Sequence, residues 1–304
     1  MLNGKRVAVV LPAYNAAATL ARTFAELDLS AIDEVLLVDD ASQDETVDIA
    51  VQLGLNPVCH QVNRGYGANQ KTCYDTALAS AADIIVMLHP DYQYSARLVV
   101  PLAAMVSCGE YDLVLGSRIL AQNAVRRGMP RYKYLANRFL TLVENFTVAG
   151  KLSEYHTGLR AYSRDMLLAI PYHLNSDEFV FDNQLILQAL AAGARIGELS
   201  CPTRYEDDSS SISLGPSIRY GLGVLRAMLQ YRLQRMGLRK YPYLTVLGIE
   251  QQSRCTNIDD AIAIVVCGMS DQPVVEDSTP LGAGSLPPPA EQTDQALTRW
   301  RNAT

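Results

Sequence analysis

The sequence predicts an α/β fold: a single domain with a mostly parallel central sheet and helices on both of its faces. Short apolar runs alternate with helix-length segments over the first 120 residues. Glycine and polar residues follow each apolar run, where a buried strand would end. The chain of 304 residues is 49% hydrophobic and 19% charged, which is enough apolar material to bury a large core.

The first 120 residues predict five strands that alternate with four helices. The apolar strand runs are residues 7–11, 34–38, 58–59, 84–88 and 113–115. The helical segments between them are residues 16–27, 44–53, 66–79 and 97–106. Because a helix returns the chain after each strand, consecutive strands are expected to run parallel.

After residue 120 the pattern is less regular. Helices are predicted at 132–148, 179–192 and 216–238, a loop entering a short strand at 153–163, and a strand at 195–201. From residue 249 the chain is rich in Pro, Gly, Ser and acids, so we expect a disordered tail, with an apolar run at 261–266. The expected organisation is a domain over 1–215, an amphipathic helical segment over 216–248 and the tail over 249–304.

Composition excludes several classes of protein. The net charge of −6 argues against a nucleic-acid partner. The six cysteines are scattered without a CxxC pair, which indicates reduced thiols in a cytoplasmic protein rather than disulfides or a zinc site. The N-terminal MLNGKRVAVVLPAYN lacks the apolar length of a signal peptide, and no run of about 18 apolar residues predicts a membrane-spanning helix. Any membrane role is therefore expected to be peripheral.

The segments that follow the five strands carry polar and glycine-rich residues. They are residues 12–15 (PAYN), 39–42 (DDAS), 63–67 (NRGYG), 89–91 (HPD) and 116–118 (GSR). Because parallel strands end at one edge of a sheet, where ligands of such folds bind, these segments are expected to lie together. The first strand is not followed by GxGxxG and the chain has no GxxxxGK[ST], so a Rossmann dinucleotide site and a P-loop are disfavoured.

Longer motifs surround these strand ends in a definite order. They are LPAYNAAATL (11–20), VLLVDDASQDETV (35–47), NRGYGANQ (63–70), LHPDYQ (88–93) and LGSR (115–118), with SEYHTGLRAYSR (153–164) and FVFDNQ (179–184) as weaker matches. The set resembles the family-2 glycosyltransferases of the GT-A fold over about residues 5–215. Within that family it is most similar to polyprenyl-phosphate sugar synthases of the dolichyl-phosphate mannosyltransferase kind, which implies a hexosyltransferase-like enzyme.

The resemblance implies that a nucleotide-sugar donor binds across the first strand ends. Pro12, Tyr14 and Asn15 would line the nucleoside pocket, with the tyrosine ring near the base. Asp39 would take the polar edge of the base or ribose, and Asp40 would support that loop. In the alternative, the two aspartates only form the turn before the next helix, which Ser42 or Asp44 would cap. The other donor-binding residues implied are Gly65 and Gly67, where the backbone would approach the donor, and Pro90.

The family usually ends its fourth strand in Asp-x-Asp, whose carboxylates hold a divalent ion on the donor diphosphate. Here His89 replaces the first acid, Asp91 keeps the second, and Gln93 stands where the synthases also carry glutamine. The resemblance therefore implies a Mn²⁺ or Mg²⁺ site at these three residues, and an imidazole ligand shifts the preference toward Mn²⁺. In the alternative, His89 only hydrogen-bonds a loop and Asp91 alone meets the metal.

Four further residues are implied to serve catalysis. Arg118 would add positive charge near the departing diphosphate, or would form a surface salt bridge. Asp182 lies where hydroxyl-directed members carry a catalytic base, or it is a charge that favours a helix N-terminus. Glu154 and His156 lie on the implied acceptor loop and would position the acceptor or form a structural network with Asp182.

The resemblance implies that the acceptor is a polyprenyl phosphate. Some residues of this chain, however, leave a hydroxyl acceptor open. The synthases carry basic residues in the loop after the last strand, whereas Glu206, Asp207 and Asp208 stand there in this chain and would repel an anionic acceptor. An anionic acceptor needs no base, but a hydroxyl does. An inverting reaction is expected, and the alternative is a nucleotide-sugar-binding scaffold that has lost catalysis.

The predicted helix at 216–238 has an apolar stripe bordered by arginines. The stripe consists of Ile218, Leu222, Leu225, Leu229, Leu233 and Met236. Such a helix suits the inner face of a membrane. Val224, Met228 and Tyr231 lie off the stripe, which equally suits packing against the domain or against a second subunit in a homodimer.

Overall fold

The computed structural model describes residues 1–120, 129–204, 214–246 and 248–249. The chain divides into two compact units, residues 1–269 and 270–304, and all of the described residues belong to the first. The acidic loop at 206–208, the apolar run at 261–266 and the rest of the predicted tail beyond residue 249 lie outside the described residues.

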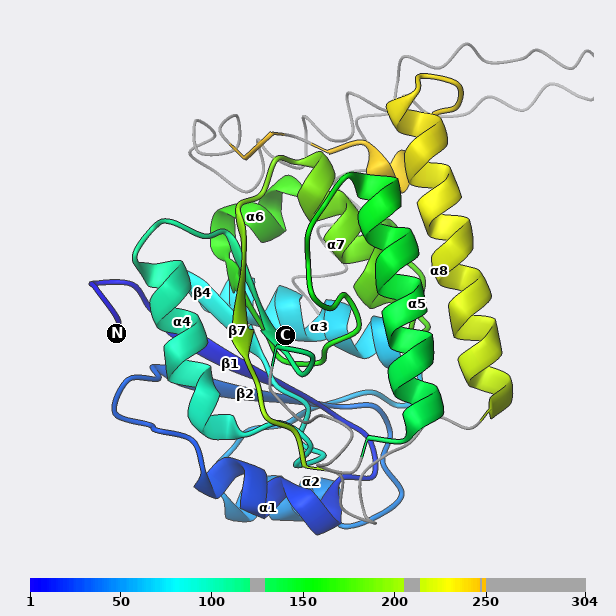
Figure 1. Ribbon diagram of the computed structural model, residues 1–304. Coiled ribbons are helices and arrows are strands. Elements are labelled where there is room, and N and C mark those ends of the chain that lie inside the picture. Colours follow the sequence, from blue (N-terminus) through cyan, green and yellow to red (C-terminus); the bar gives the residue numbers. More distant parts are fainter. Residues whose placement is uncertain (121–128, 205–213, 247, 250–304) are drawn as a thin grey trace, which may run out of the picture. The chain divides into compact units, whose positions relative to one another are not determined.

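A seven-stranded sheet forms the centre of this unit, in the order β3-β2-β1-β4-β6-β5-β7 (Figure 1). The strands are β1 Val7–Ala13, β2 Glu34–Asp39, β3 Val58–Cys59, β4 Ile84–Met87, β5 Leu113–Ser117, β6 Arg160–Ser163 and β7 Ile196–Ser200. β6 is antiparallel to β4 and β5, and the other neighbouring pairs are parallel. The prediction of a mostly parallel sheet is therefore confirmed.

Eight α-helices connect and cover the described strands. They are α1 Ala17–Ala25, α2 Thr46–Gln52, α3 Tyr66–Ala79, α4 Val99–Ser107, α5 Arg131–Val148, α6 Arg164–Ala169, α7 Phe181–Ala191 and α8 Leu214–Arg235, with short 3₁₀ turns at Ala96–Leu98, Tyr172–Leu174 and Pro242–Leu244. The helices expected from sequence are confirmed within a few residues at each end. α6 was missed because six residues are too few to show a helical period, although Ser163 caps it by accepting a bond from the Met166 N–H.

Helices lie on both faces of the sheet, as predicted, and alternate residues of β1 show the two layers. Val7, Val9 and Leu11 share an apolar cluster with residues of α1, α2 and α4. Ala8 and Val10 point to the other face, into a cluster with residues of α3, α6 and α7. Burying a Val or Leu side chain contributes about 1.5–3 kcal/mol, so both layers are held mainly by apolar burial.

α8 packs against α5 and α7 within the same unit, and Figure 1 shows α5 and α8 side by side. Its packed side is the one that lies off the predicted stripe. Val224, Met228 and Tyr231 are 0–3% exposed, and Tyr231 shares a third apolar cluster with Leu187 of α7. Packing of this helix against the domain is thus confirmed for one of its sides.

The start of α3 makes a close contact with the segment that precedes α7. The Gly67 N–H donates to the Asp177 carbonyl at 2.6 Å. A Cβ atom on Gly67 would lie 2.4 Å from the Ser176 carbonyl oxygen and 2.8 Å from the Phe181 Cβ. Only glycine therefore fits at this position, and the space beside it is filled by this chain's own backbone.

We predict that Gly67→Ala lowers the free energy of unfolding by roughly 1–3 kcal/mol, the usual cost of overpacking. Gly221→Ala is the matched control, because Gly221 lies within α8 with no atom within 4 Å of an added Cβ. That control should raise stability by about 0.5–1 kcal/mol through helix propensity. Urea denaturation measures both, and a Gly67→Ala protein as stable as wild type would contradict the close contact.

Candidate active site

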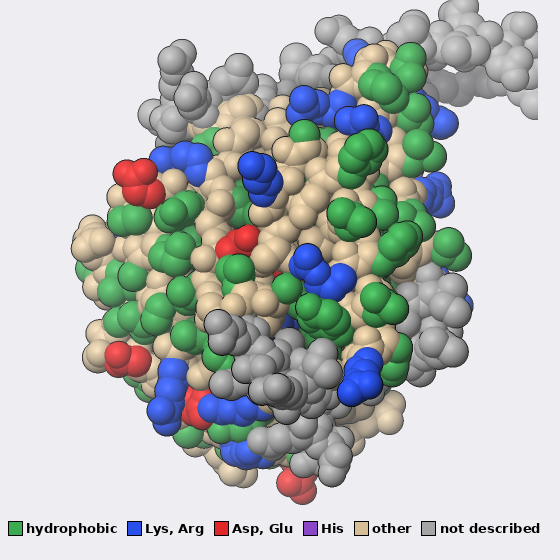
Figure 2. All heavy atoms as spheres, viewed as in Figure 1, with side chains coloured by type: hydrophobic (Ala, Val, Ile, Leu, Met, Phe, Trp, Pro, Cys, Tyr) green, Lys and Arg blue, Asp and Glu red, His purple; other side chains and the backbone are tan. Residues whose placement is uncertain are grey.

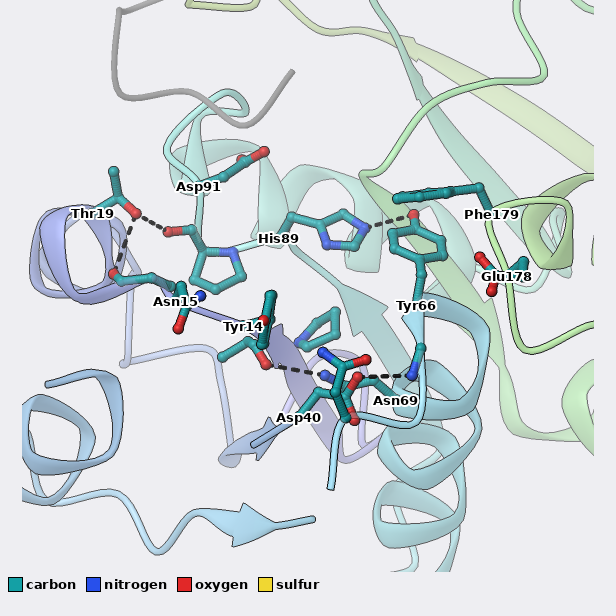
Figure 3. A pocket seen from close by; sticks show the side chains of 16 residues that line it. Tyr14, Asn15, Thr19, Asp40, Tyr66, Asn69, His89, Asp91, Glu178 and Phe179 are labelled. Atoms are coloured by element: carbon teal, nitrogen blue, oxygen red, sulfur yellow. Dashed lines mark hydrogen bonds between the residues drawn. The ribbon is translucent and has the colours of Figure 1, made fainter. Parts of the chain in front are cut away.

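A cavity of about 430 Å³ opens beyond the carboxyl ends of β1, β2 and β4 (Figure 3). Its volume is within the range of small-molecule sites. Eight of the residues predicted from sequence line it: Pro12, Tyr14, Asn15, Asp40, Gly65, His89, Pro90 and Asp91. The other predicted site residues, Asp39, Gly67, Gln93, Arg118, Glu154, His156 and Asp182, do not line it.

The loop after β1 forms one wall of the cavity. Tyr14 is 49% exposed there, which leaves its ring accessible to a flat ligand. Asn15 adopts a left-handed backbone conformation with φ of 50°, and its side-chain oxygen accepts a bond from the Gln43 N–H at 2.9 Å. Its own N–H donates to the Ser42 hydroxyl at 2.9 Å. These bonds tie the loop after β1 to the loop after β2.

Asp39 ends β2 and Asp40 follows it, and the two carboxylates have different surroundings. Asp39 is buried behind the wall, where it accepts a bond from the Ser42 N–H at 2.9 Å and so supports the loop. Asp40 lines the cavity and accepts bonds from the N–H groups of Arg64 and Gly65, both at 2.9 Å. His60 Nδ1 lies 2.7 Å from the same carboxylate. Asp40 thus fixes the glycine turn that begins α3.

Two polar side chains that sequence reasoning missed hold the strand ends together. The Asn69 amide donates to the carbonyls of Ala13 and Val38, each at 3.2 Å, and so joins α3 to the ends of β1 and β2. The Thr19 hydroxyl donates to the Pro90 carbonyl at 2.6 Å. The signal for Asn69 was present, because Tyr66, Asn69 and Gln70 are spaced i, i+3, i+4 on one face of the predicted helix.

Asp91 and His89 lie on the same cavity wall and provide a carboxylate and an imidazole (Figure 3). Gln93 lies off that wall, and its N–H donates to Asp91 Oδ1 at 3.1 Å. Within the described residues no group of three or more His, Cys, Asp and Glu side chains is placed to hold a metal ion. The pair nevertheless offers an oxygen and a nitrogen donor of the kind that Mn²⁺ or Mg²⁺ accepts, and such an ion would need its remaining ligands from a bound substrate and water.

Tyr66, at the start of α3, links this wall to α7. Its hydroxyl donates to Asp182 Oδ2 at 2.7 Å and lies 2.9 Å from His89 Nε2. Its ring stacks on His89 with centroids 5.2 Å apart, and Phe179 packs on it at 4.6 Å. Tyr66, Phe179 and Glu178 all line the cavity and were not predicted as site residues, although each lies in or beside a quoted motif.

The single proton of the Tyr66 hydroxyl determines the tautomer of His89. Since that proton goes to Asp182, His89 Nε2 must donate its own hydrogen to the tyrosine oxygen. Burial lowers the pKa of His89, against the opposing attraction of Asp91 and Asp182, so the neutral ring is favoured. In that ring Nδ1 carries a lone pair, which is the form that ligates a metal ion.

Asp182 is engaged on both of its carboxylate oxygens. Besides Tyr66, the Gln70 amide donates to Oδ1 at 3.0 Å, and the buried Arg160 guanidinium lies 3.3 Å from Oδ2. Arg160, which sequence reasoning did not single out, also donates to the carbonyls of Asp182, Tyr155 and Thr157. Asp182 therefore connects α3, β6 and α7 beside the cavity.

The remaining predicted catalytic residues lie in a largely buried network beside α5 and α8, in which the Arg118 guanidinium also donates to the His156 carbonyl. Glu154 receives bonds from the Arg118 guanidinium and, at 2.9 Å, from the Asn137 amide. His156 contacts the Tyr220 hydroxyl at 2.6 Å and Glu144 at 3.1 Å. The predicted link to Asp182 runs through the loop backbone, because Arg160 holds the carbonyls of residues 155 and 157.

Glu144, on α5, was not predicted and is fully buried. Burial raises the pKa of its carboxyl group, and the neighbouring His156 opposes the rise. The Asn183 amide of α7 also donates to it at 2.5 Å. The carboxylate therefore joins α5, α7 and the loop that carries His156.

The fold, the cavity at the carboxyl edge and its carboxylate–imidazole pair define an α/β enzyme of the GT-A type. The sequence matches the family model described as glycosyl transferase family 2 over residues 8–170. This chain belongs to that family and is a glycosyltransferase.

Similar proteins include archaeal relatives and solved enzymes. MJ1222 of Methanocaldococcus jannaschii, an uncharacterised protein, is 27% identical over 232 residues, 76% of this chain and 94% of its own length. A dolichyl-phosphate hexose transferase of Haloferax volcanii is 26% identical over 233 residues, 75% of this chain and 96% of its own length. Glucosyl-3-phosphoglycerate synthase of Mycobacterium tuberculosis, solved with Mn²⁺ and UDP-glucose, shares the fold with a TM-score of 0.59 at 22% identity, over 79% of this chain and 82% of that one.

We predict that His89 is protonated at Nε2 and not at Nδ1 in the wild-type protein, because Tyr66 accepts that hydrogen. Long-range ¹H–¹⁵N NMR of the four histidines would show this, and Tyr66→Phe should allow both tautomers. Tyr172→Phe is the matched control, since it removes another tyrosine-to-aspartate bond, to Asp75, away from the cavity. A wild-type His89 with its hydrogen on Nδ1 would contradict the assignment.

Proposed function

We propose that the enzyme transfers a sugar from a nucleotide-sugar donor, bound in the cavity with a divalent ion, to a polyprenyl phosphate. The observation that carries the proposal is the meeting of eight predicted donor and metal residues in one cavity at the carboxyl edge of the sheet. The mycobacterial enzyme with the same fold binds UDP-glucose and Mn²⁺, and the haloarchaeal relative is a dolichyl-phosphate transferase, which supports the assignment.

The two walls of the cavity suit the two ends of such a donor. Tyr14 offers an exposed ring for the base, and Asn15 is held rigidly beside it. His89 and Asp91 lie on the β4 side, where the diphosphate would meet a Mn²⁺ or Mg²⁺ ion held by both side chains. A bound divalent ion there would stabilise the negative charge that develops on the departing nucleoside diphosphate.

The proposed reaction is a single inverting displacement at the anomeric carbon. The bond between that carbon and the donor diphosphate breaks, and the electron pair leaves with the nucleoside diphosphate. A phosphate oxygen of the acceptor forms the new bond. Because that oxygen is already ionised, no base is needed, which agrees with Asp182 being fully engaged by Tyr66, Gln70 and Arg160.

A hydroxyl acceptor is the second candidate, and Glu178 is the observation that favours it. This exposed carboxylate lies on the cavity wall next to Phe179 and Tyr66 (Figure 3). Asp182, the base predicted from sequence, is a weaker choice, because removing its charge would leave the buried Arg160 without a counter-ion.

The place of action we propose is the inner face of a membrane, where the enzyme would be peripheral. No helix in the described part of the chain is long and apolar enough to cross a membrane.

A nucleotide-sugar-binding scaffold without catalysis is distinguished by a transfer assay, since it would bind donor and metal but form no product.

We predict that Asp91→Asn removes most of the strengthening that Mn²⁺ gives to nucleoside diphosphate binding. A reduction of at least about ten-fold is expected, because loss of an outer partner alone typically costs 10–100-fold in metal affinity. Calorimetry with UDP and with GDP, each with and without Mn²⁺, measures the effect. Glu178→Gln, which changes another carboxylate that lines the cavity, is the matched control and should keep the Mn²⁺ effect. Unchanged metal dependence in Asp91→Asn would remove the metal assignment.

We predict that Glu178→Gln leaves turnover with a polyprenyl phosphate within about three-fold of wild type, because an ionised acceptor needs no base. A fall of ~10²–10⁴-fold with unchanged donor affinity would instead identify a hydroxyl acceptor with Glu178 as the base. Asp182→Asn should act differently, lowering the free energy of unfolding by about 3–5 kcal/mol, since it breaks a buried ion pair.

A further inference from the structure

α5 has the reverse amphipathic pattern of an ordinary surface helix: its buried side is polar and its exposed side is apolar. Its buried described side chains are all polar: Asn137, Thr141 and Glu144. Its exposed side carries large apolar side chains, and they are Tyr132, Leu135, Phe139, Leu142 and Phe146, between 59% and 82% exposed. At 100° per residue these five fall within an arc of about 80°, opposite the buried polar side. A helix in water normally shows the reverse pattern.

α8 continues this surface. Leu222, Leu229 and Met236 are 56–63% exposed, and Leu238 in the following turn is 69% exposed. Ten of the eighteen exposed large hydrophobic side chains of the described residues lie on α5, on α8 and in this turn. Figure 2 shows hydrophobic side chains over the two helices, with Lys and Arg side chains beside them. We call this surface the α5–α8 face.

In the part of the chain that the structure describes, the exposed charged side chains on α5, on α8 and in the turn after α8 are all basic. They are Arg131, Arg138, Arg219, Arg226, Arg232, Arg235, Arg239 and Lys240. The one acid of residues 131–148 and 214–240 is Glu144, which is buried against His156. None of the eight cations forms an ion pair with another described residue. In a chain with a net charge of −6, this is a strong local excess of positive charge.

The charge decides between the surfaces that would cover these apolar side chains. A second copy pairing symmetrically through this face would bring the same patch against itself, so that cations met cations without a described acid between them. An anionic bilayer supplies the missing negative charge and also an apolar layer that accepts the exposed aromatic and aliphatic groups.

We propose that the α5–α8 face binds the surface of an anionic phospholipid bilayer. The apolar side chains of both helices enter the interface, and the eight basic residues meet lipid phosphates. This extends the proposed function, because a polyprenyl phosphate is itself a bilayer lipid, but binding to the surface requires neither donor nor metal ion.

The same two helices hold the loop beside the active site. The Tyr220 hydroxyl of α8 contacts His156 Nδ1 at 2.6 Å, and the Asn137 amide of α5 donates to Glu154 at 2.9 Å. Arg160 in turn joins the carbonyls of this loop to Asp182. A bilayer on the α5–α8 face would therefore lie against the helices that support the acceptor side of the site.

Co-sedimentation of the full chain with vesicles tests the proposal. We expect binding to vesicles of phosphatidylcholine with about 30% phosphatidylglycerol at low salt, weaker binding at high salt, and little binding to pure phosphatidylcholine. Arg219→Gln/Arg226→Gln should weaken partitioning by about 25-fold, at about five-fold for each charge. Arg6→Gln/Arg97→Gln removes the same charge from exposed positions elsewhere and should bind as wild type.

A second pair of variants tests the apolar part of the face. Phe139→Ser/Phe146→Ser should weaken partitioning at least about ten-fold at both salt concentrations, because it removes two rings from the interface. Leu29→Ser/Val51→Ser, which are 50% and 58% exposed on other elements, should have no effect. Circular dichroism and nucleoside diphosphate binding without vesicles confirm that each variant is folded.

Two outcomes would overturn the proposal. One is equal partitioning of wild type and Arg219→Gln/Arg226→Gln into anionic vesicles. The other is a wild-type dimer in light scattering that Phe139→Ser/Phe146→Ser converts to monomers, without vesicle binding by either, which would assign the face to a second copy. Nucleoside diphosphate binding is measured without lipid. Loss of that binding would count against the proposed function, whereas loss of vesicle binding alone would count against the α5–α8 face.

Discussion

The arrangement of the site depends on a buried ion pair between Arg160 of β6 and Asp182 of α7. Burial by itself would lower the pKa of Arg160, but Asp182 and nearby tyrosine hydroxyls outweigh it and raise the pKa. A buried charge is tolerated only when its partners are well placed, and breaking one partner is costly. The guanidinium also binds the carbonyls of Tyr155 and Thr157. β6, the loop before it and the start of α7 are thus fixed relative to one another.

A series of hydrogen bonds connects this ion pair through Tyr66 to His89 at the cavity. These bonds give a physical reason for histidine at the position where the family usually has aspartate. The Tyr66 hydroxyl has one proton and gives it to Asp182, so a second carboxylate at position 89 would face a lone pair. A neutral histidine can donate there and still present Nδ1 as a ligand. The substitution therefore fits an active site with this tyrosine and does not by itself indicate lost catalysis.

The strand ends were predictable from sequence, and the bonds between distant segments were not. Buried parallel strands must end at one edge, so Tyr14, Asp40 and Asp91 could be placed together from pattern alone. Tyr66 and Asp182 are 116 positions apart, and no local period relates them. Arg160 was missed for a similar reason, because a charge in a short strand is expected to face water unless a distant partner is known. Asp39 does not line the cavity and instead accepts a bond from the Ser42 N–H, and the sequence alone did not decide between donor binding and such a turn.

The two sides of α5 face two different environments. This explains why its buried side is polar and its exposed side is apolar, a pattern that is unfavourable for a helix in water. The inward side meets buried groups of the loop that carries Glu154 and His156, so it carries Asn137 beside Glu154 and Glu144 beside His156. Those polar residues cannot supply the apolar burial that normally fastens a surface helix. α8 supplies part of it by packing along α5. The outward rings of Phe139 and Phe146 contribute to stability only where a non-aqueous surface covers them. The position of α5, and with it the loop that carries Glu154 and His156, is therefore expected to respond to what covers this face.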